Sequence, residues 1–322
     1  MNMNIGPQPV FCGLLLAVLA PVSGAAAARD SAPSLSPVEL VRQAVYNEVT
    51  ANSNPGSRFM FRNQRKTAHL NQVKLLVETK DAIAGMVIAH DGHPLSVEER
   101  KQEEARLANY VQSPEALNKK RKQEKDETDH TMSILKALPT AFLYEPDGTA
   151  KGSDSVGCAG DDLVRLKFRP NPAYQPPTRV EQVLTGMAGT LLVDATQKRI
   201  AEIDGTLMQD VGFGWGILGH LDRGGHFLVQ QADVGGRQWE VKHMELAFTG
   251  KVLMMKKISI QSTDTFSDFR SVPLDLTFAQ GVELLKKSAG QANASMGSLP
   301  DSAANASAKK EIPRGLKAEA NR

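Results

Sequence analysis

Residues 189–207 read GTLLVDATQKRIAEIDGTL, two apolar segments on either side of the polar turn residues 196–198. Leu191–Val193 lies before the turn, and Ala201 and Ile203 alternate with polar neighbours after it. Short segments with a two-residue period and a tight polar connection are typical of antiparallel strands joined in a hairpin. The stretch therefore predicts two neighbouring strands with one apolar face.

The same pattern repeats toward both ends of the chain. Further strands are predicted around Phe59–Phe61, Val73–Val77, Val164–Phe168, Phe227–Val229, Trp239–Val241 and Val252–Ile260. Turns are predicted at Asp91-Gly92, Gly235-Gly236 and Thr249-Gly250. Strands do not alternate with helices as parallel β-α-β units would require, so the pattern predicts an antiparallel meander. We expect an α+β fold built on a curved antiparallel sheet.

Two helices are marked by their caps. Ser36-Pro37-Val38-Glu39 places a capping serine, a proline at the first helical position and a glutamate at the third. This predicts a helix from Pro37 to about Thr50 whose apolar face includes Val41 and Val45. Thr277 and Gln280 similarly predict a short closing helix that ends near Ser288.

A charged helical insertion is predicted at residues 95–138. Ser96 and Ser113 provide helix starts, and acidic and basic residues occur in nearly equal numbers between Glu98 and Asp129. Apolar residues are sparse, so we expect these helices to rest on a sheet edge or on one another. A docking surface for a protein partner is the alternative role of this interval.

The two ends of the chain differ in composition from the middle. Residues 1–28 combine an uncharged apolar segment with a small-residue cleavage site, as in a secretory signal peptide. About 13 apolar residues fall short of the roughly 20 that a spanning helix needs, so no transmembrane segment is expected after cleavage. We predict a periplasmic protein with one domain at residues 29–288 and a disordered tail at 289–322.

Charge and cysteine content narrow the function classes. The 322-residue chain has a formal net charge of +2, so its overall charge gives no argument for nucleic-acid binding. After signal cleavage Cys158 is the remaining cysteine, and one thiol cannot form an internal disulfide. We interpret it as a loop thiol.

The segment 213–219 reads FGWGILG and contains the glycine spacing G-x-G-x-x-G. A dinucleotide site needs this turn between a strand and a helix, whereas here the helix would have little room before Gly224-Gly225. We therefore predict no nucleotide or other cofactor. We expect the glycines to bend the sheet around a concavity, with ligand-binding side chains from Phe213, Trp215, Ile217, Leu218 and Phe227.

Familiar catalytic and metal-binding motifs are missing from the sequence, which contains no G-x-S-x-G, H-E-x-x-H or C-x-x-C. His90 and His93 flank the predicted turn Asp91-Gly92 and are two ligands at most, so we interpret them as polar turn residues. We predict no catalytic residue and no metal site.

Three segments resemble exported bacterial proteins of the LolA/LolB-like superfamily, the fold of the outer-membrane lipoprotein carriers. They are FRPNPAY at 168–174, GTLLVD at 189–194 and FGWGILG at 213–219. The resemblance implies an incomplete antiparallel barrel whose concave side is covered by helices. We therefore expect a binding protein that holds a lipid, an acyl chain or another apolar ligand in that concavity. The alternative is a structural or signalling interaction protein with a filled core.

Overall fold

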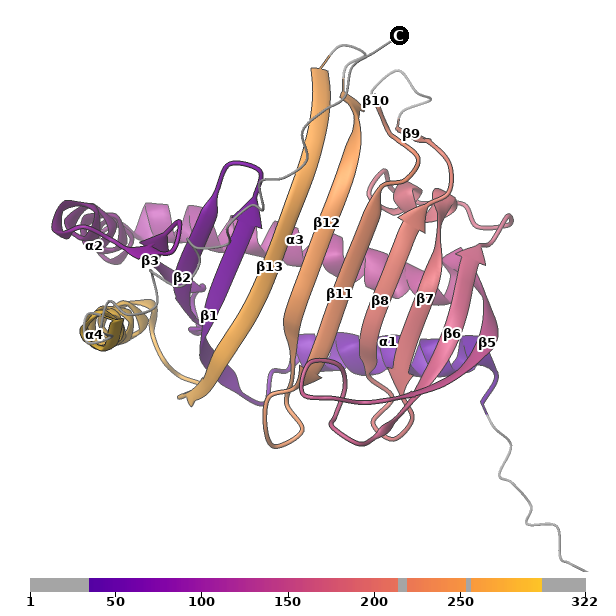
Figure 1. The fold of residues 1–322 in the computed structure, drawn as a ribbon, viewed down its shortest axis with the longest axis horizontal. Helices are drawn as coiled ribbons and strands as arrows, with labels where there is room; N and C mark the ends of the chain where they lie inside the picture. Colours follow the sequence, from indigo (N-terminus) through magenta and orange to yellow (C-terminus); the bar gives the residue numbers. More distant parts are fainter. Residues whose placement is uncertain (1–34, 214–218, 253–255, 297–322) are drawn as a thin grey trace, which may run out of the picture. The chain divides into compact units, whose positions relative to one another are not determined.

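The computed structural model describes residues 35–213, 219–252 and 256–296. The predicted signal peptide and residues 297–322 lie outside this range, so the predictions for them stay predictions. The described chain is α+β, with an open antiparallel sheet of 13 strands that does not close into a barrel (Figure 1). The predicted fold class is confirmed.

The sheet consists of two meanders, β1 to β4 and β5 to β13, which are joined where β1 pairs with β13. The strands are β1 Arg58–Thr67, β2 Asn71–Val77, β3 Ala84–His90, β4 His93–Pro94, β5 Phe142–Lys151, β6 Asp162–Pro170, β7 Met187–Asp194, β8 Ile200–Leu207, β9 Val211–Phe213, β10 Gly219–Leu221, β11 His226–Asp233, β12 Trp239–Val252 and β13 Lys256–Val272. Eleven of them follow the order β4-β3-β2-β1-β13-β12-β11-β8-β7-β6-β5, and β10 pairs with β12 and with β9 beside this path. The first strand, β1, therefore pairs with the last, β13. The helical interval connects the two meanders.

The hairpin predicted from residues 189–207 is formed by β7 and β8, with Leu191 opposite Ile203. The turns at Asp91-Gly92 and Gly235-Gly236 are also confirmed, and both residues of the first have positive φ, +50° and +82°. Such a pair matches the right-handed twist of the flanking strands. These turns set the strand register.

The turn predicted at Thr249-Gly250 is wrong, because both residues lie inside β12, where Gly250 faces Ile258 on β13. The glycine is needed for another reason. A Cβ at Gly250 would lie 2.2 Å from the carbonyl oxygen of His220 on β10. This glycine therefore marks the close approach of a third strand rather than a reversal of the chain.

Within the described ranges, four α-helices and one 3-10 helix accompany the sheet. They are α1 Pro37–Ser53, α2 Val97–Gln112, α3 Pro114–Ala141, α4 Phe278–Met296 and the 3-10 helix η1 Glu181–Gly186. At the start of α1, Ser36 Oγ accepts a hydrogen bond from Glu39 N, as predicted. The Glu39 carboxylate bonds to Arg42, so the Ser36 hydroxyl forms the capping contact without its reciprocal bond. Helix α4 continues to Met296, past the end predicted near Ser288.

Helix α3 does more than rest on a sheet edge, so that expectation is wrong for its last turns. Ala137, Leu138 and Ala141 are buried in the core, and Leu138 O accepts a hydrogen bond from Tyr144 Oη at 2.8 Å. The charged residues belong to the earlier turns of the helix, which are exposed. The composition of residues 95–138 as a whole is highly charged and does not reveal that the last turns of α3 are buried.

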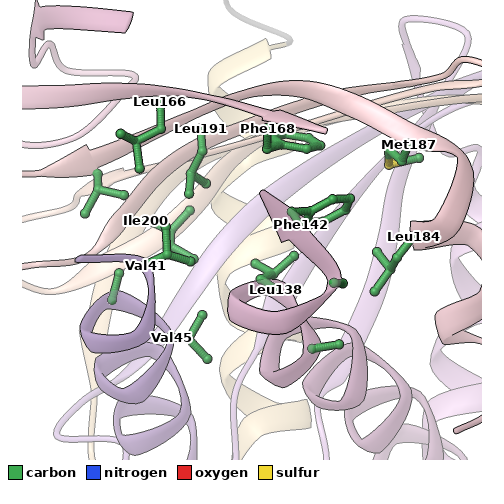
Figure 2. Close-up of a cluster of buried hydrophobic side chains, with 14 of the residues drawn as sticks. Val41, Val45, Leu138, Phe142, Leu166, Phe168, Leu184, Met187, Leu191 and Ile200 are labelled. Carbon is green, nitrogen blue, oxygen red and sulfur yellow. The ribbon is translucent and has the colours of Figure 1, made fainter. Parts of the chain in front are cut away.

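Two large clusters of buried side chains and a smaller third one hold the described chain together. The main core packs α1 and the end of α3 against β6, β7 and β8, and its side chains converge from both layers (Figure 2). The α4 core packs α4 and Leu107 of α2 against β2 and β3, around Val77, Met86 and Leu285. Buried apolar surface on this scale is the main stabilising contribution to the fold.

Candidate functional site

A cavity of about 850 Å³ lies between the sheet and helices α1 and α3, next to the main core. Helix α1 crosses behind the strands in Figure 1, and α3 runs across the same face of the sheet. Several lining residues at the α1 end and on α3 are exposed, namely Asn52, Pro55 and Thr131. The cavity is therefore open to solvent between the end of α1 and the middle of α3.

One end of the cavity is apolar. Its walls are formed by α3, by η1 and by strands in which every second side chain points toward the cavity. The apolar lining includes Ile134, Leu135, Leu138, Phe142, Phe168, Leu184, Met187, Leu191, Ile203, Phe227, Val229 and Leu246. Figure 2 shows Leu138, Phe142, Phe168 and Met187 gathered under the sheet. Such a lining favours hydrocarbon over water.

The other end is polar and lies where β1, β8 and β12 begin. Glu48 of α1 is 8% exposed, and its carboxylate accepts two hydrogen bonds from Arg199, both at 2.8 Å. Its Oε1 also accepts from Ile200 N at 2.9 Å. The Arg199 guanidinium lies 5.6 Å from the ring centroid of Trp239. Because both charges are paired and hydrogen-bonded, this ion pair can be buried at the cavity wall.

Arg58 and Glu78 face the same end of the cavity from β1 and from the end of β2. Glu78 Oε2 accepts a hydrogen bond from Phe59 N at 2.9 Å. Burial raises the pKa of Glu78, and that hydrogen bond and the Arg58 charge oppose the rise. Arg58 Nη1 is buried and has no hydrogen-bond partner within the described part of the chain. It is therefore a donor that a ligand oxygen can satisfy.

Glu240 completes the polar end. Burial, followed by the negative charge of Glu78, raises the pKa of Glu240 to about 8. Its carboxyl group therefore carries a proton at neutral pH and acts as a hydrogen-bond donor as well as an acceptor. With this carboxyl neutral, the arginines 58 and 199 face the two remaining acidic side chains, Glu48 and Glu78. The arrangement suits a polar head group at this end and an apolar chain at the other.

The predicted ligand-binding residues are placed unequally by the structure. Phe227 lines the cavity from β11. Phe213 belongs to β9, but its side chain lies outside the described part of the structure, as do Trp215, Ile217 and Leu218. The role predicted for those four stays a prediction.

Sequence reasoning missed the polar end. Glu48 follows Val41 and Val45 on the apolar face of α1, and a charge on a buried face was the available signal. Arg58 and Glu240 gave no such signal, because they meet only through the pairing of β1 with β13 and of β13 with β12. These side chains line one cavity only because distant strands pair in the sheet.

The other side chains considered for chemistry lie elsewhere. His90 and His93 flank the β3–β4 turn and, among the described residues, join no group of three metal-ligating side chains. Cys158 lies in the loop between β5 and β6. Burial raises the pKa of its thiol, and so do the charges of Asp233, Asp194 and Asp161. At neutral pH this thiol is protonated and hence a weak nucleophile.

Comparison with known proteins supplies no relative. No protein-family model, curated protein or solved structure matches this chain. Within the described residues, no helix combines the length and apolar character needed to cross a membrane.

Proposed function

We propose that this chain is an exported, periplasmic binding protein that holds the apolar chain of a lipid or similar amphiphile between α1, α3 and the sheet. The observation that carries the proposal is the cavity of about 850 Å³, apolar at one end and polar at the other. Small-molecule sites typically have volumes of roughly 300–1,000 Å³. The resemblance to the lipoprotein carriers favours the same class of ligand, and the proposal names no enzyme activity and no cofactor.

The apolar lining supplies the binding free energy in this proposal. Each buried methylene group contributes about 0.8 kcal/mol, so a chain of about 16 carbons gains roughly 12 kcal/mol before ordering costs are subtracted. Few polar contacts are then needed for a stable complex. Phe227 and Val229 of β11 are in position to contact the chain, because both line the cavity.

The polar end orients the ligand. Arg58 Nη1 lacks a hydrogen-bond partner in the described chain, and a carboxylate or phosphate oxygen of the ligand head would satisfy it. The protonated Glu240 is a second donor that lines the same cavity. A head group with oxygen acceptors is therefore favoured over a cationic one.

Ligand carry-over tests the proposal directly. The protein is purified from its native periplasm, extracted with organic solvent, and the extract is analysed by mass spectrometry. We expect a reproducible lipid or fatty acid, together with binding of a fluorescent fatty-acid probe to the delipidated protein. Protein that is empty and also fails to bind the probe would overturn the proposal and favour the interaction protein with a filled core.

A cavity-filling variant locates the bound probe. Val229→Phe extends a side chain into the cavity, and we expect it to weaken probe binding at least about tenfold, the loss of one to two methylene contacts or more. The matched control is Leu228→Phe on the same strand, because successive strand residues point to opposite faces. Equal probe binding by both variants would place the probe outside this cavity.

A further inference from the structure

The loop that joins β5 to β6 covers the sheet face opposite to the helices. Gly157 N donates to Gln231 O at 2.8 Å, and Asp233 N donates to Gly157 O at 3.1 Å, so the loop is fixed to β11. In Figure 1 this loop passes in front of the strands, whereas α1 lies behind them. A small cluster that includes Leu163 and Leu192 is buried under it. The loop is therefore an ordered part of the fold.

Three metal-ligating side chains meet at this loop. Cys158 Sγ, a carboxylate oxygen of Asp161 and a carboxylate oxygen of Asp194 all lie within 4.8 Å of one another. Cys158 and Asp161 belong to the loop, and Asp194 is the last residue of β7. The group therefore joins the β5–β6 loop to the β7–β8 hairpin.

Asp194, one of the three, has a buried oxygen without a hydrogen-bond partner from the residues that the structure describes. The residue is fully buried, at 0% exposure. Its Oδ1 accepts hydrogen bonds from Thr196 N at 2.9 Å and from Gln197 N at 2.6 Å. Its Oδ2 is buried and has no partner among the described residues. A buried carboxylate oxygen without a partner costs free energy, and a bound cation removes that cost.

Gln197 orients the thiol. Trp239 Nε1 can only donate, and it donates to Gln197 Oε1 at 3.2 Å. The amide nitrogen of Gln197 therefore points the other way and donates to Cys158 Sγ at 3.0 Å. An N–H group directed at sulfur stabilises the thiolate form and fixes its position, as outer-shell groups do in metal sites.

We propose that Cys158, Asp161 and Asp194 bind a divalent transition-metal cation, with Zn²⁺ the best match. The Cys158 thiolate and one oxygen from each carboxylate supply three ligands, and a water molecule completes a tetrahedron. The thiol proton passes to solvent when the metal binds. Zn²⁺ accepts both sulfur and carboxylate oxygen at about 2.0–2.3 Å, whereas Mg²⁺ and Ca²⁺ require oxygen ligands. The cation would cross-link the loop to the β7–β8 hairpin.

Cobalt substitution tests the site with a signal that only a thiolate gives. The full mature chain is stripped with a chelator and titrated with Co²⁺. We expect one equivalent to bind with a thiolate-to-cobalt charge-transfer band in the near ultraviolet, and Zn²⁺ to displace it. Cys158→Ser should abolish the band. Asp194→Asn and Asp161→Asn should each weaken binding by more than the roughly 10–100-fold that loss of an outer-shell partner costs.

Asp162→Asn is the matched control, because Asp162 is adjacent in sequence but is exposed and pairs with Lys151 at 2.8 Å. It should bind Co²⁺ like the parent protein. Thermal melting of the metal-free proteins shows whether each variant folds, and Zn²⁺ should raise the melting temperature of the parent and of Asp162→Asn alone. Absence of the band in the parent, or unchanged binding in Cys158→Ser and Asp194→Asn, would overturn the proposal. Neither result depends on whether the cavity binds lipid.

Discussion

The two cores use the same elements, an amphipathic helix on an antiparallel sheet, but the cavity beside the main core is larger than the one beside the α4 core. In the α4 core, small residues allow close contact: an added Cβ at Gly281 would lie 2.7 Å from Thr79 Cγ2 on the neighbouring segment. In the main core, α1 packs apolar side chains on the sheet, and its Glu48 also forms an ion pair with Arg199, the residue before β8. The glycine lets α4 lie directly on its sheet. The Glu48–Arg199 pair instead places polar side chains between α1 and the sheet.

The difference extends to the cavities beside each core. The cavity next to the α4 core measures about 360 Å³ and is lined partly by charged side chains, among them Lys74 and Arg106. The cavity beside the main core measures about 850 Å³ and is lined mainly by apolar side chains. An unfilled apolar cavity costs stability, so its size beside the main core is in keeping with the proposed binding function.

The largest expected effect is the difference in unfolding free energy between a substitution in the α4 core and one at the wall of the larger cavity. Leu285→Ala in α4 removes a side chain at 0% exposure, and we expect a loss of roughly 3–5 kcal/mol in the free energy of unfolding. Ile203→Ala at the cavity wall should cost about 1–2 kcal/mol, because the side chain already borders open volume. Urea unfolding of both variants measures the difference. Equal losses would mean that the two cores are packed alike.

The next effect concerns pH and the polar end of the cavity. Burial raises the pKa of Glu240 from 4.5 to about 8, so the folded protein keeps this proton at pH values where the unfolded chain has lost it. The contribution of Glu240 to stability is therefore highest below pH 4.5 and declines as the pH rises toward 8. The decline should reach about 3 kcal/mol by pH 7.

Glu240→Gln removes that titration and is the matched comparison. The difference between parent and variant in free energy of unfolding should grow with pH between about 4.5 and 8, always in favour of the variant. Denaturant unfolding at a series of pH values measures it. A difference that does not change with pH would show that Glu240 ionises normally and that the polar end is more hydrated than the geometry indicates.

The meander was predictable because its signals are local. Two-residue periodicity and turns such as Asp91-Gly92 depend on near neighbours, and they were sufficient for the antiparallel sheet and most of its hairpins. Gly250 was misread because the atom that requires a glycine there belongs to His220 on another strand. A local pattern cannot distinguish a glycine that turns the chain from one that lets another backbone approach.

The candidate site was less predictable for the same reason. Phe227 was found because an apolar residue on an inward strand face is visible in the sequence. Arg58 and Glu240 come together only through strand pairings that span most of the chain, and Asp194 is buried by a loop that precedes it in sequence. The polar groups of the site thus come together through pairing between strands that are far apart in the sequence. The periodicity of a single strand does not reveal that pairing.

The smallest expected effects compare two glycines on α4 itself. Gly281→Ala places a methyl group 2.7 Å from Thr79 Cγ2, and Thr79 cannot easily move because its hydroxyl donates to Ala82 O at 2.6 Å. We expect a net loss of about 1 kcal/mol in the free energy of unfolding, since overpacking outweighs the gain in helix propensity. Thermal or urea unfolding measures it.

Gly290→Ala is the matched control on the same helix. Gly290 is exposed and an added Cβ meets no atom within 4 Å, so the substitution keeps the gain in helix propensity without the clash. We expect stabilisation of up to about 1 kcal/mol. Opposite signs for the two variants would confirm that α4 packs directly on its sheet through Gly281. Stabilisation by both would mean that α4 is held farther from β2 and β3, and the contrast between the two cores would then lose its basis.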